Sequence, residues 1–231
     1  MSAVAMHMSD GLLDTKTSLL FAGVAVVGLA VAAARARNDL DDRTAPLAGL
    51  VAAFVFATQM LNFPVLPGVS GHLLGGALAA MLVGPWVGAL CVSIVLVVQA
   101  LVFADGGLTA LGANITNMAL IGTAAGFLVA TLLKRFAKNR AGLAVTAFVA
   151  AFTNTVIASF GFVLEFAIGG DPAFSLGTVT ATLVGVHCLI GVGEGVITAL
   201  TLVAVAAVRP DLVYLLRGSH KALDVREETL A

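Results

Sequence analysis

The sequence contains few charged residues. Asp, Glu, Lys and Arg together make up 11% of its 231 residues, whereas hydrophobic residues make up 60%. A soluble globule of this length needs more polar side chains than that to cover its surface. Several apolar runs also reach the roughly 18 to 20 residues that a membrane-spanning helix needs. The composition therefore excludes a soluble globular domain and predicts an integral membrane protein.

Aromatic residues and cysteines are also scarce. Aromatic residues make up 6% of the chain, whereas it has 25 glycines. Small residues allow transmembrane helices to approach one another closely, so we expect a tightly packed helix bundle. The two cysteines, Cys91 and Cys188, both lie inside apolar runs. We expect buried free thiols there and no structural disulfide.

The sequence has no Walker A motif, no GxGxxG motif and no extended basic patch. These absences argue against an ATPase, a dinucleotide-binding enzyme and a nucleic-acid-binding protein. We predict a non-enzymatic membrane protein without a cofactor. If its function requires energy, another subunit must supply it.

Seven apolar segments predict an all-α, polytopic bundle of about seven transmembrane helices in a single domain of residues 1–231. A polar leader, 1–16, precedes the bundle of residues 17–208, and a tail follows at 209–231. The predicted spans are 17–34, 45–63, 73–86, 87–104, 109–133, 141–168 and 176–208. Gly84 and Pro85 predict a tight hairpin between the third and fourth spans.

The basic residues predict the orientation of the bundle. Lys and Arg follow the first, fifth and seventh spans, whereas the connections at 63–72, 105–108 and 169–175 contain neither residue. Short cytoplasmic loops are rich in Lys and Arg. This pattern predicts an N-terminus outside the cell and a C-terminus in the cytoplasm, in a protein that contacts membrane lipid.

Ionisable and amide side chains inside the spans are candidates for a functional site. His187 and Glu194 are seven residues apart, so they share one face of the last helix. Asn114 and Asn117 have the i, i+3 spacing that also places two side chains on one face. Two interpretations stay open for these four residues: they line or support a ligand cavity, or they hold the helices together. Ser70, just before the third span, is a further candidate for lining or supporting the cavity.

Two of the four histidines lie on the predicted outer face. His7 is in the leader stretch AMHMSDGLLD, and His72 is in the stretch PGVSGHLLGG, where the third span begins. We expect His72 to face a cavity at the outer mouth and the leader to fold back over that mouth. Imidazole binds divalent ions such as Ni²⁺ and Co²⁺ well.

A chain that begins Met-His can chelate such an ion through its terminal amine, the backbone nitrogen of the histidine and the imidazole. His72 can then supply a fourth nitrogen. The chelate needs a free amine on Met6, which five residues precede. We therefore expect the functional chain to begin at Met6 and to lack the segment MSAVA.

Four stretches of the chain closely resemble the CbiM/NikM family. They are MHMSDGLLD, PGVSGHLLGGALAAMLVGPW, LVFADGGLTALGANITNMALIG and VHCLIGVGEGVIT. The family comprises the substrate-capture (S) components of prokaryotic cobalt and nickel energy-coupling factor transporters. The resemblance implies a seven-helix protein of the prokaryotic plasma (inner) membrane. It also implies that Met6, His7 and His72 bind the transported ion.

The resemblance further implies partner proteins. These are a transmembrane coupling (T) subunit, a pair of cytoplasmic ATPases and, in many systems, a small auxiliary membrane protein. Cobalt and nickel are not distinguished by the residues, because both ions accept the same nitrogen ligands.

An alternative function belongs to a different class. The stretch GVSG, at 68–71, fits a motif of rhomboid intramembrane serine proteases. Ser70 would be the nucleophile and His187 its base, which requires the two side chains to lie within hydrogen-bonding distance. This alternative leaves His7 and His72 without a role.

Overall fold

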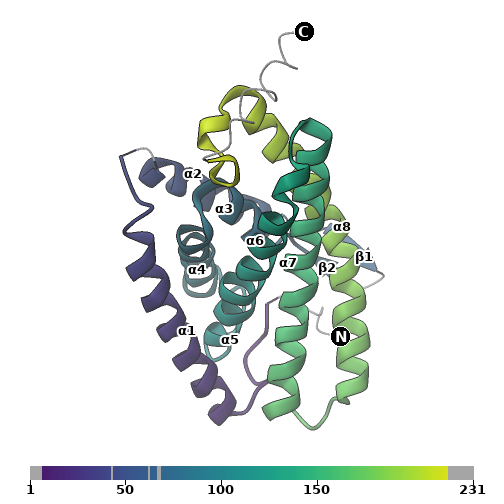
Figure 1. Cartoon of the computed structure of the whole chain (residues 1–231). Helices are drawn as coiled ribbons and strands as arrows, with labels where there is room; N and C mark the ends of the chain where they lie inside the picture. The colour runs from purple at the N-terminus through teal and green to yellow at the C-terminus, as the bar shows by residue number, and fades with distance from the viewer. Residues whose placement is uncertain (1–6, 43, 62, 67–68, 218–231) are drawn as a thin grey trace.

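The computed structural model describes residues 7–42, 44–61, 63–66 and 69–217 and confirms the predicted all-α bundle (Figure 1). Its helices are α1 (Thr15–Ala36), α2 (Thr44–Met60), α3 (Gly76–Val83), α4 (Pro85–Val102), α5 (Leu111–Asn114), α6 (Thr123–Leu133), α7 (Arg140–Gly169) and α8 (Leu176–Val208). A π-helix, η1 (Ile115–Gly122), joins α5 to α6, and short 3₁₀ turns follow α6 and α8, namely η2 (Lys134–Phe136), η3 (Pro210–Leu212) and η4 (Tyr214–Leu216).

Each of the seven predicted spans corresponds to a helix or, for the fifth, to the continuous stretch from α5 to α6. Among the described residues, five of these helical segments are long and apolar enough to cross a membrane. They are α1, α4, the stretch Leu111–Phe136, α7 and α8. The second, α2, has 17 residues. The chain is therefore a multi-pass membrane protein.

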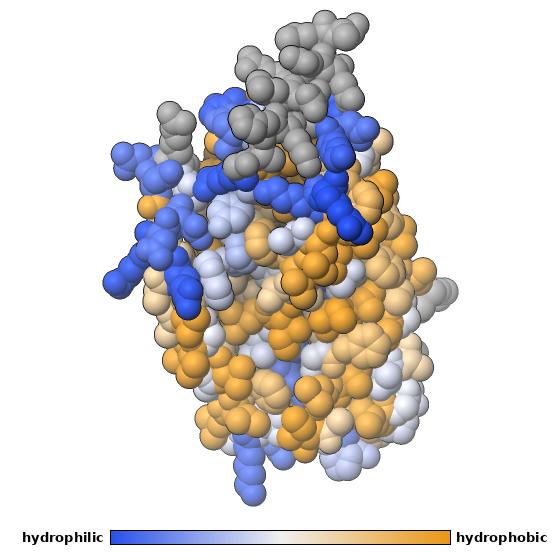
Figure 2. Space-filling view, viewed as in Figure 1, coloured by the Kyte–Doolittle hydropathy of each residue, from blue (hydrophilic) through white to orange (hydrophobic). Residues whose placement is uncertain are grey.

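The surface has the polarity of a membrane protein. Apolar side chains cover most of the flank shown in Figure 2, and hydrophilic side chains gather at the end that carries η3 and η4. The basic residues Arg35, Lys134, Arg135 and Arg209 lie near this end of the helices, which we call the basic end. The opposite end, where α1 begins and α7 meets α8, is called the leader end.

The third predicted span is much shorter than its apolar run. Its helix, α3, has only eight residues, and Gly71 to Gly75 precede it without helical structure. All residues from Gly71 to Gly84 are buried. Irregular backbone is stable inside a membrane protein when surrounding protein satisfies its polar groups. The groups that do so here belong to α2 and α8.

A small antiparallel hairpin precedes this segment, although the sequence predicted no strand there. Its strands are β1 (Phe63–Leu66) and β2 (Val69–Gly71), with Phe63 opposite Gly71. Ser70 lies in β2, and its side chain is outside the part of the chain that the structure describes.

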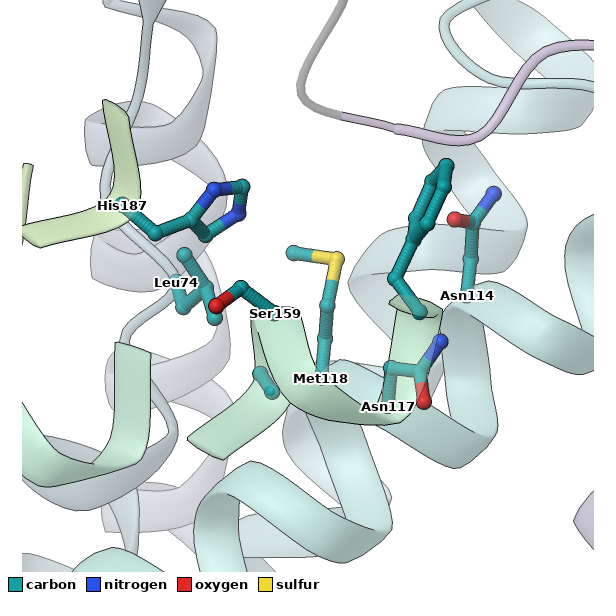
Figure 3. Close-up of a pocket in the computed structure, with 8 residues that line it drawn as sticks. Leu74, Asn114, Asn117, Met118, Ser159 and His187 are labelled. Atoms are coloured by element: carbon teal, nitrogen blue, oxygen red, sulfur yellow. The ribbon is translucent and has the colours of Figure 1, made fainter. Parts of the chain in front are cut away.

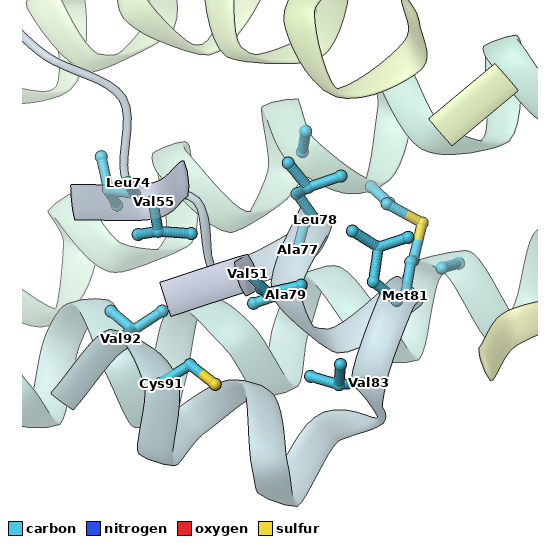
Figure 4. Packing of buried hydrophobic residues seen from close by; sticks show 14 of the residues in the cluster. Val51, Val55, Leu74, Ala77, Leu78, Ala79, Met81, Val83, Cys91 and Val92 are labelled. Atoms are coloured by element: carbon cyan, nitrogen blue, oxygen red, sulfur yellow. The ribbon is translucent and has the colours of Figure 1, made fainter. Parts of the chain in front are cut away.

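The core is built from small and branched apolar side chains. Figure 4 shows Val51 and Val55 of α2 close to α3, with Cys91 and Val92 of α4 in the same cluster. Alanines such as Ala77 are fully buried, so the helices pack closely as predicted. Both cysteines are free; Cys91 is buried, whereas Cys188 is only partly so.

Polar side chains fix where three of the helices begin. Asp14 accepts a hydrogen bond from the backbone nitrogen of Thr17, at 2.7 Å, and caps α1. Asn139 and Ser175 cap α7 and α8 in the same way. Such N-caps satisfy backbone N–H groups that have no partner inside the helix.

Candidate metal-capture site

The leader enters the bundle from the leader end. In Figure 1 it runs back from the start of α1 between α5 and α7. The backbone of Asp14 donates to Gly169 at 2.7 Å, and Asp171 donates to Leu12 at 3.0 Å. These bonds tie the leader to the connection between α7 and α8. The leader therefore lies inside the bundle and not merely over its mouth.

Asn114 holds the leader through both groups of its amide. Its Oδ1 accepts from the backbone nitrogen of Met8 at 2.9 Å, and its Nδ2 donates to the Met8 carbonyl at 3.1 Å. Further along, Asp10 accepts a hydrogen bond from the Thr109 backbone nitrogen at 2.8 Å. A hydrogen bond from the Thr109 hydroxyl, and secondarily this backbone bond, lower the pKa of Asp10. The side chain of Met8 is fully buried.

Glycine is required where the leader meets the loop before α5. A Cβ atom on Gly107 would collide with the backbone nitrogen of Asp10 and would lie 2.7 Å from the carbonyl carbon of Ser9. The Gly107 nitrogen also donates to the Met8 carbonyl at 2.9 Å. The leader can therefore approach this loop only because residue 107 has no side chain.

His7 is 1% exposed, and its Nδ1 lies 3.1 Å from Oδ1 of Asp105. Because a carboxylate only accepts hydrogen bonds, we assign the proton to Nδ1. This bond lowers the pKa of Asp105. The Nε2 of His7 is buried and has no hydrogen-bond partner among the described residues.

His72 lies in the irregular segment before α3 and is 2% exposed. Its Nδ1 is 2.8 Å from the carbonyl of Leu73, which assigns the proton to Nδ1 and leaves a lone pair on Nε2. Burial, and secondarily the neighbouring His7, lower the pKa of His72 to about 3. The ring is therefore neutral near pH 7, as a metal ligand must be.

The structure brings the two predicted histidines together. Their ring centroids are 4.6 Å apart, with a tilt of 45° between the planes. The Nε2 of His72, like that of His7, is buried without a partner in the described part of the chain. Both rings are inside the protein, whereas we expected His72 to face a cavity at the outer mouth. No group of three or more His, Cys, Asp or Glu side chains within the described residues could hold a metal.

A small cavity lies beside the leader (Figure 3). Its volume of about 20 Å³ is close to what one water molecule occupies. The polar side chains that line it are those of Asn114, Asn117, Ser159 and His187. Whether these amide and imidazole groups support a bound ligand stays a prediction.

The contacts assign these residues different tasks. Asn117 donates to Glu165 of α7 at 2.7 Å, and His187 bonds the Leu183 carbonyl one turn earlier at 2.8 Å. Glu194 does not line this cavity but bonds the backbone before α3.

The remaining predicted residue, Met6, lies outside the described residues. Asp105 was not predicted as a site residue. Its position before two adjacent glycines was the feature of the sequence that could have indicated it.

Comparison with known proteins shows the family. The profile of the CbiM family, described as the cobalt uptake substrate-specific transmembrane region, matches residues 7–212. The chain belongs to this family. Membership confirms the predicted resemblance, and it makes the chain a membrane component of cobalt or nickel transport. It gives no support to the rhomboid alternative, and Nδ1 of His187 bonds the Leu183 carbonyl.

CbiM-family relatives cover most of the chain. A putative fused nickel transport protein NikMN of Archaeoglobus fulgidus is 41% identical over 90% of this chain and 68% of its own length. The cobalt transport protein CbiM of Geobacter sulfurreducens is 36% identical over 91% of this chain and 62% of its own length. A crystal structure of a transition metal transporter has a TM-score of 0.74 and 27% identity, over 92% of this chain and all of the other.

Proposed function

We propose that this chain captures Co²⁺ or Ni²⁺ from outside the cell for an ATP-driven uptake transporter. The observation that carries the proposal is the contact between His7 and His72, two buried imidazole rings whose centroids are 4.6 Å apart, in which Nε2 of His72 has no hydrogen-bond partner among the described residues. Buried polar groups without partners are rare and each calls for an explanation. A divalent cation that binds imidazole nitrogen provides one.

The leader supplies further nitrogen ligands in this proposal. The amine of Met6, the backbone nitrogen of His7 and the imidazole of His7 close two fused rings around the ion, and His72 supplies the fourth nitrogen. Only Nδ1 of a histidine can close a ring with its own backbone nitrogen, because Nε2 lies too far from it. Because Nδ1 of His7 carries the proton that bonds Asp105, binding of the ion at Nδ1 would break this hydrogen bond, and the neutral imidazole would carry its proton on Nε2 instead.

Partner proteins would supply the energy for uptake. We propose a transmembrane coupling (T) subunit, a pair of cytoplasmic ATPases and a small auxiliary membrane protein, as the family resemblance implies. The basic loops support an orientation with the leader end outside. The ion then reaches His7 and His72 from the side of the membrane on which uptake begins.

Metal titration of two versions of the chain tests this function. One version begins at Met1 and the other at Met6, and each is titrated with Co²⁺ and with Ni²⁺ by calorimetry. We expect tight binding with proton release when Met6 carries the free amine, because chelating nitrogens must be deprotonated. We expect much weaker binding when five residues precede Met6.

His7→Ala in each version is the control, and it should remove the difference between them. Equal affinity of the two unmodified versions would contradict the amine chelate. If neither version bound either ion, the capture function itself would be wrong.

A further inference from the structure

The segment that carries His72 is held from two sides by buried side chains. Gln59 of α2 donates its Nε2 to the Leu74 carbonyl at 2.6 Å. On the other side, Glu194 of α8 accepts hydrogen bonds from the backbone nitrogens of Leu74 and Gly75, both at 2.9 Å. Because His72 is only two residues from Leu74, these bonds determine where its imidazole can lie.

Each oxygen of Glu194 accepts two hydrogen bonds. Oε2 takes the Leu74 nitrogen and the hydroxyl of Thr155, the latter at 2.7 Å. Oε1 takes the Gly75 nitrogen and Nδ2 of Asn154, the latter at 3.2 Å. All four partners are donors, which suits a carboxylate that only accepts. Glu194 is 1% exposed, so bulk water does not reach these hydrogen bonds.

The backbone of this segment depends on the same contact. Gly75 has a φ of +79°, and a Cβ atom there would lie 2.9 Å from the methyl groups of Val55. The left-handed conformation interrupts regular helix at the start of α3. It presents two successive N–H groups to one carboxylate instead of to carbonyls one turn earlier. The segment therefore stays irregular although its sequence is apolar.

We propose that Glu194 is the positioning residue of the metal-capture site, which it serves by fixing the backbone of Leu74 and Gly75 and thereby the direction of the His72 imidazole. This inference rests on the proposed function of His72 as a ligand. Glu194 itself does not contact the ion. Groups that orient metal ligands typically change metal affinity by about 10- to 100-fold when they are replaced.

Glu194→Gln tests the inference with almost no change in size. A glutamine has one accepting oxygen, and each carboxylate oxygen of Glu194 accepts one N–H of the segment. In either orientation of the amide, the nitrogen of Leu74 or Gly75 faces another donor. We expect Ni²⁺ and Co²⁺ to bind about 10- to 100-fold more weakly, with an altered visible absorption spectrum of the bound Ni²⁺.

Glu165→Gln is the matched control. Glu165 is also 1% exposed, but it lies on α7 and accepts a hydrogen bond from Asn117. The same chemical change there should leave metal affinity within about twofold, because the observed hydrogen bond does not involve the His72 segment. A comparable loss of affinity in this variant would overturn the inference, because any buried carboxylate would then have the same effect.

A double-variant cycle separates positioning from general destabilisation. In a chain that already carries His72→Ala, Glu194→Gln should weaken the remaining metal binding no further, because the ring it positions is absent. If Glu194→Gln lowered metal affinity as much in the His72→Ala chain as in the unmodified chain, Glu194 would not act through His72. If the unmodified chain bound neither ion, the proposed function would fail before the inference was reached.

Glu194→Asp provides the second variant in case the glutamine variant does not fold. It keeps the accepting carboxylate but shortens the side chain by one methylene. We expect Glu194→Asp to lower metal affinity less than His72→Ala does, and only in chains that retain His72. Unchanged affinity in a folded Glu194→Asp or Glu194→Gln chain would contradict the proposal.

Discussion

The two ends of the bundle hold their buried side chains in different ways. Towards the leader end, His7 and Asn114 are buried in a network of specific hydrogen bonds. Near the basic end, Leu143, Ala147 and Val83 are buried in apolar contacts. Apolar packing tolerates small shifts, whereas a buried hydrogen-bond network loses stability when one partner moves. This contrast indicates that one end sets the geometry of the site and the other contributes mainly to stability.

The largest expected effect separates these two roles. His72→Ala removes a proposed nitrogen ligand, so we expect metal affinity to fall by more than about 100-fold. Replacing a residue that only orients a ligand costs at most about that much. Because His72 is itself buried, this variant also leaves a cavity and should lower the free energy of unfolding without metal. Leu143→Ala should lower the free energy of unfolding by about 2 to 3 kcal/mol because it leaves a cavity in fully packed core.

Calorimetric titration and thermal unfolding in the same detergent check both halves of this prediction. We expect Leu143→Ala to bind Ni²⁺ with the affinity of the unmodified chain at a temperature where both are folded. The contrast between the ends would be wrong if Leu143→Ala lost metal affinity as His72→Ala does.

A second prediction concerns two glycines. Gly107→Ala adds a methyl group that collides with the leader, whereas Gly185→Ala in α8 adds one where no atom lies within 4 Å. The first should displace the leader and weaken metal binding about tenfold or more. The second should leave binding unchanged and can slightly favour the helix, since alanine is the better helix former.

Limited proteolysis provides the measurement. Because the leader is tied down by its contacts with the 105–114 segment, cleavage near Ser9 should be faster in Gly107→Ala than in Gly185→Ala. Equal cleavage rates would mean that the leader does not depend on the close approach at Gly107.

Most of the fold could be predicted because it depends on local patterns. Apolar length and basic loops located the helices to within a few residues; the last span, 176–208, coincides with α8. The third span was the exception, because 73–86 is uniformly apolar but only Gly76–Val83 is helical. Its backbone bonds a carboxylate 120 residues away, and such a contact leaves no trace in local hydropathy.

The same limit applies to the site. His7 and His72 could be predicted because few side chains bind transition metals and both histidines fall on one predicted face of the membrane. Asp105 could not be assigned a task, since its bond to His7 joins residues 98 positions apart. The role of Gly107 could not be predicted either, because Gly107 is far from the leader along the chain. The motif that contains Gly107 resembles the family, but it does not indicate a contact with the leader.

The smallest predicted effect is an acid-induced loosening of the leader. Hydrogen bonds from Thr109 lower the pKa of Asp10 below its usual value of about 3.9. The stabilisation is therefore present above that value and is lost as the pH falls through the lowered pKa. Because Asp10 is exposed, we expect exchange of the Met8 amide hydrogen, corrected for intrinsic rate, to rise only about threefold.

Asp10→Asn sharpens this last prediction. The variant keeps an accepting oxygen for Thr109 but cannot titrate, so part of the acid effect should disappear. The remainder is expected from Asp105, whose pKa is lowered mainly by its hydrogen bond with His7. The basic end offers the reference, because Leu143 and its apolar neighbours contain no group that titrates in this range. An equally large acid effect on exchange in α7 near Leu143 would mean that acid loosens the whole bundle and not the leader alone.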